Sequence, residues 1–587
     1  MKRVYSQIYL NTRSRKKQCV EKKYITPSML YNSLNNDHLI DFLSKKSKVL
    51  VKNNINNNNN NNYNTYIQKK GIEFENLIVK YINDNITPVI HVSDRITEES
   101  LEKTKQYILE GKPIIHSAPL RNDENQTQGI ADLIVRSDYI NKLVENQILT
   151  DDEIKIKAFN LLGNYHYIVV DIKFSTIPLR KNGIHLMNTG SYSFYKSQCY
   201  IYTTALGKIQ GYQPQYAFIL GRRSKNSLLG INYNSLSTLG KISYDTVDLI
   251  SIQNTNEAIK WITELDNNYQ NWTCFPPSND KLYPNMNITS KIYQEDKEKI
   301  AKQLKEITLI WNVGLKHRNI ALTKGIKSYK DINCNTKNLG INGKKEKIIN
   351  HIIEINKQDK DLIRPKNINY NITKWRDDSN EIFLDFETIG DIFTDFSELP
   401  YQPPINLIFM IGIGYKDNNQ EFNYKSFIAQ ELTIDGEFEI MNEFIEFYKN
   451  LNNPRITYWS ADKNIWEKAE ERQFENINNS VKKNIISDNW NIISEWFNMT
   501  QMFHDVPIVI KDCYKFGLKE IVEVMNKHNF IKIQNNSECK NGMTAMVEAY
   551  NYYKDTQNKE IINNIEKYNK FDVEVLYKII NYLRKNH

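Results

Sequence analysis

The spacing of apolar positions divides this 587-residue chain into two kinds of segment. Short apolar runs predict strands, and apolar positions that recur every three or four residues predict helices. In the front half, strands are expected at 130–136, 165–174 and 215–220, and helices at 27–48, 71–83 and 195–206. In the back half, strands are expected at 381–386, 407–415 and 455–459, and helices at 463–472, 518–527, 545–554 and 559–585. This mixture predicts an α/β protein.

Breaks in the pattern indicate how the chain is organised. Residues 290–360 are mainly helical and polar, and they follow a proline-rich stretch at 272–284. We therefore predict two α/β domains joined by a helical connector. The expected units are a basic flexible arm at 1–26, a first domain at 27–275 with a disordered Asn-rich loop at 53–64, the connector at 276–364 and a second domain at 365–587.

Two of these segments allow more than one interpretation. The basic run at 13–17 is either a nuclear or nucleic-acid-binding patch or part of a solvated tail. Residues 307–326 suggest two short helices around a glycine turn. Such a pair is either a helix-hairpin-helix that grips phosphates through backbone N–H groups or an ordinary spacer.

Composition narrows the class of protein. Aromatic residues make up 11% of the chain, which argues against disorder throughout. The longest strongly apolar run, 407–414, is much shorter than the ~20 residues that cross a bilayer, so no membrane partner is expected. The chain has 76 Asn and 62 Lys but 15 Arg, a bias that A/T-rich codons explain, as in a giant virus or certain protists. We give this bias no functional weight.

Charge and cysteine usage add two expectations. Residues 1–23 carry a net charge of +7 and residues 365–587 one of −9, so the basic front suits phosphate and the acidic back suits a metal ion. The six cysteines include no CxxC pair, which argues against a disulfide scaffold, a zinc ribbon or an iron–sulfur cluster. With no secretory signal visible, an intracellular protein of the cytoplasm or nucleus is expected.

Charged residues stand at the ends of predicted elements in the first domain. Asp171 and Lys173 are two apart on a strand and therefore share a face. Asp132 on another strand and Glu75 on a helix would add carboxylates, and such a group suits Mg²⁺ or Mn²⁺. This metal would make a water molecule more acidic, while Lys173 would steady the charge that develops on phosphorus.

Four motifs follow one another in this domain. They are Gly71-x-x-x-Glu75, Gly129-x-x-Asp132, Asp171-x-Lys173 and Gln198-x-x-x-Tyr202. Taken singly, each also has an ordinary interpretation, as a surface ion pair, a turn residue or core packing. As an ordered set, they resemble the RecB-like branch of the PD-(D/E)XK nucleases over about 27–275, which implies a restriction-endonuclease-like fold.

This resemblance implies a role for each residue. Asp132 and Asp171 would bind the metal, Glu75 would assist them, and Lys173 would be the catalytic lysine. Gln198 and Tyr202, which lie on one helix, would bind substrate and line its path to the site. Some relatives use an upstream histidine as a further ligand, for which His116 is a candidate.

The second domain carries its own carboxylates. Asp385 and Glu387 are two apart at the end of an apolar strand, so they point to the same side, and their repulsion favours a metal cation as a partner over a place on the surface. Tyr568 and Asp572 share one face of the last helix. Asp462 follows a strand and is either a metal ligand or a helix N-cap.

These residues resemble the tyrosine subgroup of the DEDD 3′–5′ exonucleases, which have a ribonuclease-H-like fold. Residues 511–520 and 542–572 further resemble its YprB-like branch. The resemblance implies four ligands for two divalent metals, Asp385, Glu387, Asp462 and Asp572. Tyr568 would orient the attacking water. Asp462 does not align cleanly with that family, so Asp505 is a substitute candidate.

A RecB-like domain, a helical connector and a YprB-like domain together match an architecture of bacterial, archaeal and giant-virus proteins. The match implies a metal-dependent nuclease with two sites that processes DNA ends in repair, replication or recombination, in a viral factory if the source is a giant virus. Two alternatives stay open: an RNA-processing nuclease, and a nucleic-acid-binding scaffold with an inactive second domain.

Overall fold

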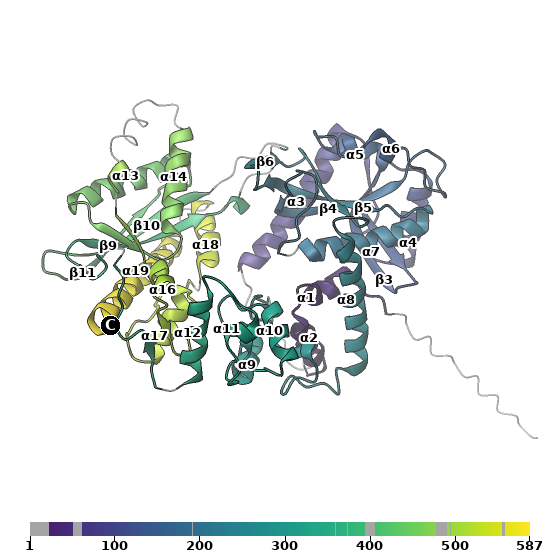
Figure 1. The fold of residues 1–587 in the computed structure, drawn as a ribbon. Coiled ribbons are helices and arrows are strands. Elements are labelled where there is room, and N and C mark those ends of the chain that lie inside the picture. The colour runs from purple at the N-terminus through teal and green to yellow at the C-terminus, as the bar shows by residue number, and fades with distance from the viewer. Residues whose placement is uncertain are drawn as a thin grey trace, which may run out of the picture.

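A computed structural model gives the fold as two α/β lobes with a helical segment between them (Figure 1). The structure describes residues 23–50, 62–190, 192–290, 292–358, 360–371, 374–393, 399, 406–476, 490–493, 495–539, 541–554 and 558–587. Both lobes contain mixed sheets, so the predicted α/β class is confirmed. Within the described residues, no helix is long and apolar enough to cross a membrane.

The first lobe is built on a seven-stranded sheet in the order β1-β2-β3-β4-β5-β6, with β7 also paired to β5. Its strands are β1 (Val89–His91), β2 (Ile114–Asn122), β3 (Thr127–Arg136), β4 (Tyr167–Pro178), β5 (Tyr216–Asn226), β6 (Ile231–Asn234) and β7 (Gly240–Ser243). Its helices are α1 (Tyr31–Leu34), α2 (His38–Leu50), α3 (Asn62–Asn85), α4 (Glu98–Leu109), α5 (Ser137–Leu143), α6 (Asp151–Ile154), α7 (Tyr192–Gln210) and α8 (Leu249–Asn268), with 3₁₀ turns at Pro27–Leu30 and Asp280–Leu282.

Alternation along the strands gives this sheet two apolar faces. On β4, Tyr167 and Val169 pack with α7 and α8, whereas Ile168 and Val170 pack on the α3 side. A strand buried on both faces reads as a continuous apolar run, which is why β4 could be predicted from the sequence. The sheet thus fixes α3 and α7 on its two faces, and both helices carry candidate site residues.

The second lobe has a five-stranded sheet in the order β11-β10-β9-β12-β13. Its strands are β9 (Glu381–Ile389), β10 (Leu407–Lys416), β11 (Phe422–Ile428), β12 (Arg455–Tyr458) and β13 (Trp496–Asn498). Its helices are α13 (Ile434–Asn450), α14 (Asp462–Asn476), α16 (Met499–Asp505), α17 (Leu518–Lys527), α18 (Gly542–Lys554) and α19 (Lys559–Asn586), with 3₁₀ turns at Asp391–Phe393 and Trp490–Ile492. Strand β9 is central, antiparallel to β10 and parallel to β12.

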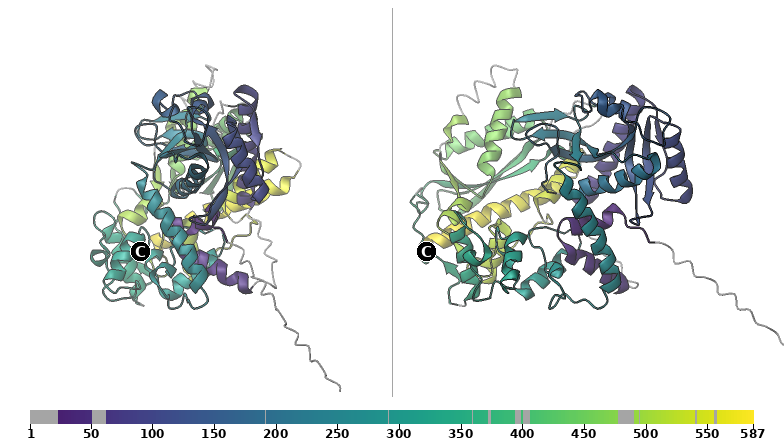
Figure 2. Two further views of the ribbon diagram at one scale, coloured as in Figure 1. Left: turned by 90° about the vertical axis from the view of Figure 1, so that its right-hand side faces the viewer. Right: turned by 45° about the vertical axis from the view of Figure 1, so that its right-hand side comes forward.

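The connector contains α9 (Gln294–Leu304), a 3₁₀ turn at Ile307–Leu309, α10 (Leu315–Thr323), α11 (Thr336–Leu339) and α12 (Glu346–Lys357). It ends in β8 (Ile363–Arg364), which pairs with β14 (Val509–Ile510) of the second lobe. Connector residues such as Ile349 and Ile353 belong to the same apolar cluster as Phe503 and Leu576. The connector is therefore packed against the second lobe as one unit (Figure 2).

Several predicted boundaries differ from the observed ones. The expected flexible arm reached residue 26, but Ile25 is buried and pairs through its backbone with Gln126 and Gln128, because it forms a bridge beside Thr127 at the start of β3. Residues 62–64 of the expected Asn-rich loop form the first turn of α3, while 53–61 and 1–22 lie outside the described residues. In the expected helix pair at 307–326, the structure has a 3₁₀ turn and the single α-helix α10.

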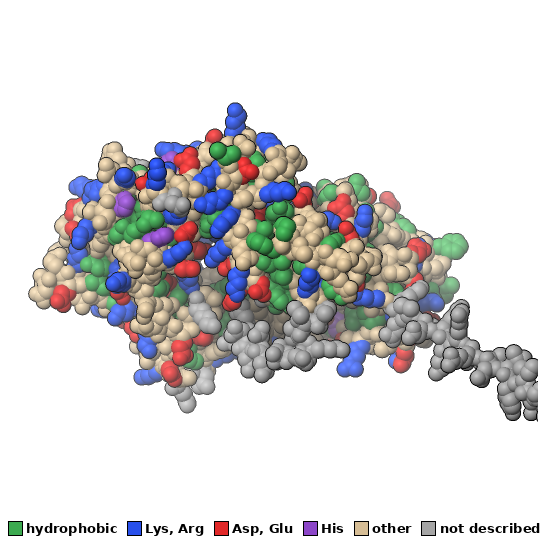
Figure 3. Space-filling view, turned by 90° about the horizontal axis from the view of Figure 1, so that it is seen from below, with side chains coloured by type: hydrophobic (Ala, Val, Ile, Leu, Met, Phe, Trp, Pro, Cys, Tyr) green, Lys and Arg blue, Asp and Glu red, His purple; other side chains and the backbone are tan. Residues whose placement is uncertain are grey.

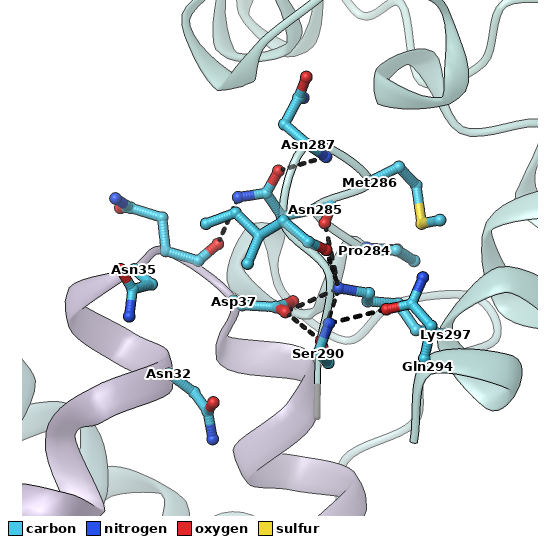
Figure 4. A network of polar contacts seen from close by, with 12 residues as sticks. Asn32, Asn35, Asp37, Pro284, Asn285, Met286, Asn287, Ser290, Gln294 and Lys297 are labelled. Atoms are coloured by element: carbon cyan, nitrogen blue, oxygen red, sulfur yellow. Dashed lines mark hydrogen bonds and ion pairs between the residues drawn. The ribbon is translucent and has the colours of Figure 1, made fainter. Parts of the chain in front are cut away.

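A buried ion pair joins the first lobe to the connector (Figure 4). Lys297 on α9 donates to Asp37 Oδ2 at 2.8 Å and to the carbonyl of Ile288 at 2.6 Å. Ser290 also donates to Asp37 Oδ2, at 2.7 Å. The side chains of Lys297 and Asp37 are 0% and 2% exposed, so each relies on the other for its charge balance.

We expect Lys297→Met to lower the stability of this junction by about 3–5 kcal/mol, because it leaves the buried charge of Asp37 without a cation. The double variant Lys297→Met/Asp37→Asn is expected to recover most of that loss. Scanning calorimetry of the three proteins checks this. A single variant as stable as the double variant would contradict the assignment.

Candidate active sites

The first candidate site lies where β3 and β4 separate. The pairing of these antiparallel strands ends at Leu133 and Val170, so that Asp132, just before Leu133, and Asp171, just after Val170, lie beyond the paired region. Beyond that point, the backbone N–H of Ile172 donates to Asp132 Oδ2 at 2.7 Å. The Asp132 carboxylate thus accepts a backbone N–H that a neighbouring strand's carbonyl would otherwise accept. This contact places Asp132 beside Asp171.

Lys173 lies between the two aspartates. Its Nζ is 2.6 Å from Asp171 Oδ2 and 3.6 Å from Asp132 Oδ2. Asp171 is fully buried, and despite this close approach neither of its oxygens accepts a well-aligned hydrogen bond within the described structure. Burial raises the pKa of Asp171, with Lys173 opposing and Asp132 adding to the shift. Burial alone would lower the pKa of Lys173, but Asp171 and Asp132 outweigh it and hold that pKa above its usual range.

Helix α7 covers this site with three side chains. Gln198 Nε2 donates to the hydroxyl of Tyr202 at 3.3 Å, as their one-turn spacing suggested. Gly129 makes room for this helix, since a Cβ there would lie 2.5 Å from the Tyr202 ring. The ring of Tyr195, which the sequence analysis missed, lies 5.3 Å from Lys173 Nζ. Aromatic residues are common on this helix, so no sequence signal set Tyr195 apart.

Glu75 approaches from α3 on the other face of the sheet. Its Oε1 is 3.0 Å from His116 Nε2, and His116 Nδ1 is 3.2 Å from Nδ1 of His91. Glu75 also raises the pKa of Asp132, after the larger effect of burial. The structure therefore joins Glu75 and His116 to the group around Asp132.

The second candidate site is centred on β9. Asp385 and Glu387 project from this strand, while Tyr568 and Asp572 come from α19. Glu387, Tyr568 and Asp572 are buried. Tyr568 and Asp572 lie close enough to affect each other's pKa: Asp572 raises that of Tyr568, and Tyr568 lowers that of Asp572.

Asp462 belongs to this second group. It is the first residue of α14; burial raises the pKa of its carboxyl, and the backbone N–H groups of Asp462 itself, Phe386 and Trp459 oppose that rise. Phe386 stands between Asp385 and Glu387, so Asp462 lies directly beside β9. The substitute candidate Asp505 instead binds Gln501 at 2.7 Å and Tyr370 at 3.4 Å, on α16. Asp462 is thus the first residue inside α14 and not the N-cap that precedes it, and it adjoins the carboxylates of β9 and α19.

The four carboxylates of this group affect one another's pKa values. Burial raises the pKa of Asp385 most, and Asp462, Glu387 and Asp572 raise it further. Burial also raises the pKa of Glu387, of Asp462 and of Asp572. For Glu387 and Asp462, a further rise comes from Asp572. Burial and mutual repulsion therefore both disfavour the ionised form of these four carboxylates.

Two residues at this site were not predicted. Asn569 is fully buried, donates from Nδ2 to Asp385 Oδ2 at 2.9 Å and accepts from the hydroxyl of Tyr424 at 3.0 Å. A Cβ at Gly412 would lie 1.5 Å from Asn569 Oδ1, so the glycine gives the amide its place. Lys519 on α17 lies 5.0 Å from the Tyr568 ring, and its charge lowers the pKa values of Asp385, Glu387 and Asp572. In a chain rich in Asn and Lys, neither residue stood out.

The donor set at both sites fits Mg²⁺ or Mn²⁺ in kind, because it consists of carboxylate oxygens. The full burial of the Asp171 carboxylate and the mutual repulsion around Asp385 agree with that chemistry. Across the described part of the chain, no group of three or more His, Cys, Asp or Glu side chains is already placed to hold a metal ion.

Polar and aromatic contacts join the two lobes close to both sites. Arg222 on β5 donates to Asp391 Oδ1 at 2.7 Å and lies 5.1 Å from the ring of Phe174, which follows Lys173. Asp391 itself follows shortly after Glu387 at the end of β9. Tyr66, on the helix that carries Glu75, lies 4.8 Å from the Phe393 ring centre. The position of one site is thus linked to that of the other.

Comparison with known proteins does not identify the chain. No protein-family model matches the sequence, and no curated protein matches it. The roles of the residues described above therefore depend on their geometry and on the resemblance of the motifs.

We expect Asp385→Asn to raise the melting temperature in EDTA, because it removes one like charge from a buried group. A gain of about 1 kcal/mol would correspond to roughly 2–4 °C in a domain of this size. Asp505→Asn, which alters an aspartate outside the group, should not produce this gain. Thermal unfolding of the three proteins without divalent metal checks this, and a destabilised Asp385→Asn would contradict the charge argument.

Proposed function

We propose that the protein is a metal-dependent nuclease that hydrolyses phosphodiester bonds of nucleic acid at two sites. The observation that carries this proposal is the group of four carboxylates drawn from three separate elements, β9, α14 and α19. Burying such a group is unfavourable unless a cation joins it. Four carboxylates in this position destabilise the fold, so their presence is not explained by a contribution to stability.

The first site supports the same chemistry. Lys173 stays protonated beside Asp171 and Asp132, so it serves as a positive charge for a phosphoryl group and not as a general base. Burial raises the pKa of the nearby Cys199 thiol well above its usual value, which disfavours a thiolate nucleophile. We therefore favour direct attack by water without a covalent enzyme intermediate.

Each site would bind a divalent cation through its own carboxylates. At the first site these are Asp132 and Asp171 with the help of Glu75, and at the second Asp385, Glu387, Asp462 and Asp572. When bound, Mg²⁺ or Mn²⁺ supplies a more acidic water molecule and polarises a phosphoryl oxygen. Tyr568 keeps its proton, since burial and Asp572 raise its pKa, so its hydroxyl can orient a water molecule. Asn569 keeps Asp385 in position.

DNA ends are the favoured substrate, in repair, replication or recombination, with trimming of 3′ ends assigned to the second site. The protein would then belong with the RecB-like and YprB-like nucleases that its motifs resemble. An RNA substrate is the main alternative, and competition between matched DNA and RNA separates the two. A scaffold with an inactive second domain would bind nucleic acid but lose no activity in Asp385→Ala.

We expect end-labelled single- and double-stranded DNA to be cleaved in Mg²⁺ or Mn²⁺ but not in EDTA. Lys173→Ala should abolish the first activity, and Asp385→Ala should remove the trimming of 3′ ends, each by at least ~100-fold because each removes a charged group from the reaction centre. The double variant should be inactive.

Matched controls are Lys181→Ala, an exposed lysine of the first lobe, and Asp505→Ala in the second. Both controls should cleave like the wild type. Full cleavage by the double variant would show that neither site is responsible. An absence of cleavage on DNA and on RNA would reject the proposed activity.

A further inference from the structure

We propose that the exposed face of the connector between residues 314 and 347 binds the phosphate backbone of nucleic acid, apart from both candidate sites. The inference depends on the proposed function for the identity of its ligand. Its test measures binding without cleavage, so the two can fail separately.

Charge is concentrated in this segment. Between residues 314 and 347 there are nine Lys or Arg and two acidic residues, whereas the whole chain has 77 basic and 69 acidic side chains. The A/T-rich codon bias enriches lysine along the entire chain. It does not explain why acidic residues are scarce here, so the basic surface is a local feature.

Eight of these basic residues are exposed lysines. They are Lys316, Lys324, Lys327, Lys330, Lys337, Lys344, Lys345 and Lys347. Within the described structure, no acidic side chain forms an ion pair with any of them. The acids of the segment are engaged elsewhere, since Asp331 accepts from the backbone of Asn333 and Glu346 from the hydroxyl of Thr336. The positive charge is therefore not neutralised within the described residues.

The lysines are displayed on a folded surface. Buried Ile326, Leu339 and Ile349 hold the segment together from below. Lys324 Nζ donates to the carbonyl of Asn338 at 2.8 Å, which joins α10 to α11. Lys345 Nζ donates to Asn312 Oδ1 at 3.1 Å. Lysines carried by a folded backbone lose less entropy on binding a polyanion than lysines on an unfolded tail do.

The chemistry of this face favours nucleic acid over an anionic membrane. A helix that lies on a membrane needs a continuous apolar strip beside its basic residues. Among the large apolar side chains described between 314 and 347, Ile332 is exposed and the others are buried or half-buried. A lysine surface without such a strip suits the regularly spaced charges of a phosphate backbone.

The location also suits this ligand. The connector lies between the two lobes (Figure 1), and on the underside Lys and Arg side chains lie near the middle of the molecule, with some Asp and Glu side chains among them (Figure 3). A nucleic-acid strand bound to this face would lie between the lobes that carry the two candidate sites. The connector would then retain a long substrate while either site acts on it.

The test uses the full-length triple variant Lys337→Gln/Lys344→Gln/Lys347→Gln. Its matched control, Lys532→Gln/Lys559→Gln/Lys585→Gln, removes the same charge from exposed positions of the second lobe. Fluorescence anisotropy with labelled 30-mer single-stranded and duplex DNA in EDTA, from 50 to 200 mM salt, measures affinity. We expect the connector variant to bind about 10-fold more weakly, with a log K against log salt slope reduced by roughly 2–3, because each lost phosphate contact contributes about 0.7–0.9.

The control should bind within twofold of the wild type. Equal binding by the connector variant and the control, or no DNA binding by the wild type, would overturn the inference. Phosphatidylserine vesicles form the second arm. If the wild type binds them more tightly than DNA and the connector variant loses that binding, the face serves a membrane and the inference is wrong.

Discussion

Carboxylates that are removed from water and brought together repel one another, and the second lobe holds four of them around its central strand. Asp385 and Glu387 are fixed by the pleat of β9, because residues two apart share a face. Asp462 and Asp572 are added by helices that begin or cross beside that strand. Lys519 offsets part of this charge, and a divalent cation would offset more. The packing that surrounds β9 has to outweigh this repulsion.

Both lobes hold acidic side chains away from bulk water, and they do so with similar arrangements of sheet and helices. Each places acids on or beside a strand of a sheet covered on both faces by apolar contacts, so the acids are held away from bulk water. Each uses a glycine, Gly129 or Gly412, where a polar or aromatic side chain from a helix must approach the strand. The first lobe adds its own cation, Lys173, between two aspartates. The corresponding cation of the second lobe, Lys519, lies beside the Tyr568 ring and lowers the pKa values of Asp385, Glu387 and Asp572.

The sequence predicted those parts of the fold that have a strong local signal. Helix α17 occurs over the predicted residues, and β9, β10 and β12 lie where apolar runs indicated. Short or edge strands such as β1 and β6 were missed, because three or four residues carry little periodicity. The shared cluster of the connector and second lobe was also missed, since it depends on packing between residues far apart in the chain.

The same limit applies to the candidate sites. Motif order was enough to indicate Asp171, Lys173, Asp385 and Asp572, because regular spacing on strands and helices fixes which side chains share a face. The position of Asp462 depended on how α14 meets β9, and Asn569 acquires its role only through contact with Gly412. Such residues become visible when the elements are assembled.

The central claim is that two separate carboxylate groups bind divalent cations. Titration with Mn²⁺, followed by electron paramagnetic resonance, tests it without reference to any substrate. The account predicts saturable binding by the wild type, with different portions lost in Asp171→Asn and Asp385→Asn and nearly all lost when the two changes are combined. Binding by the combined variant equal to that of the wild type would contradict it.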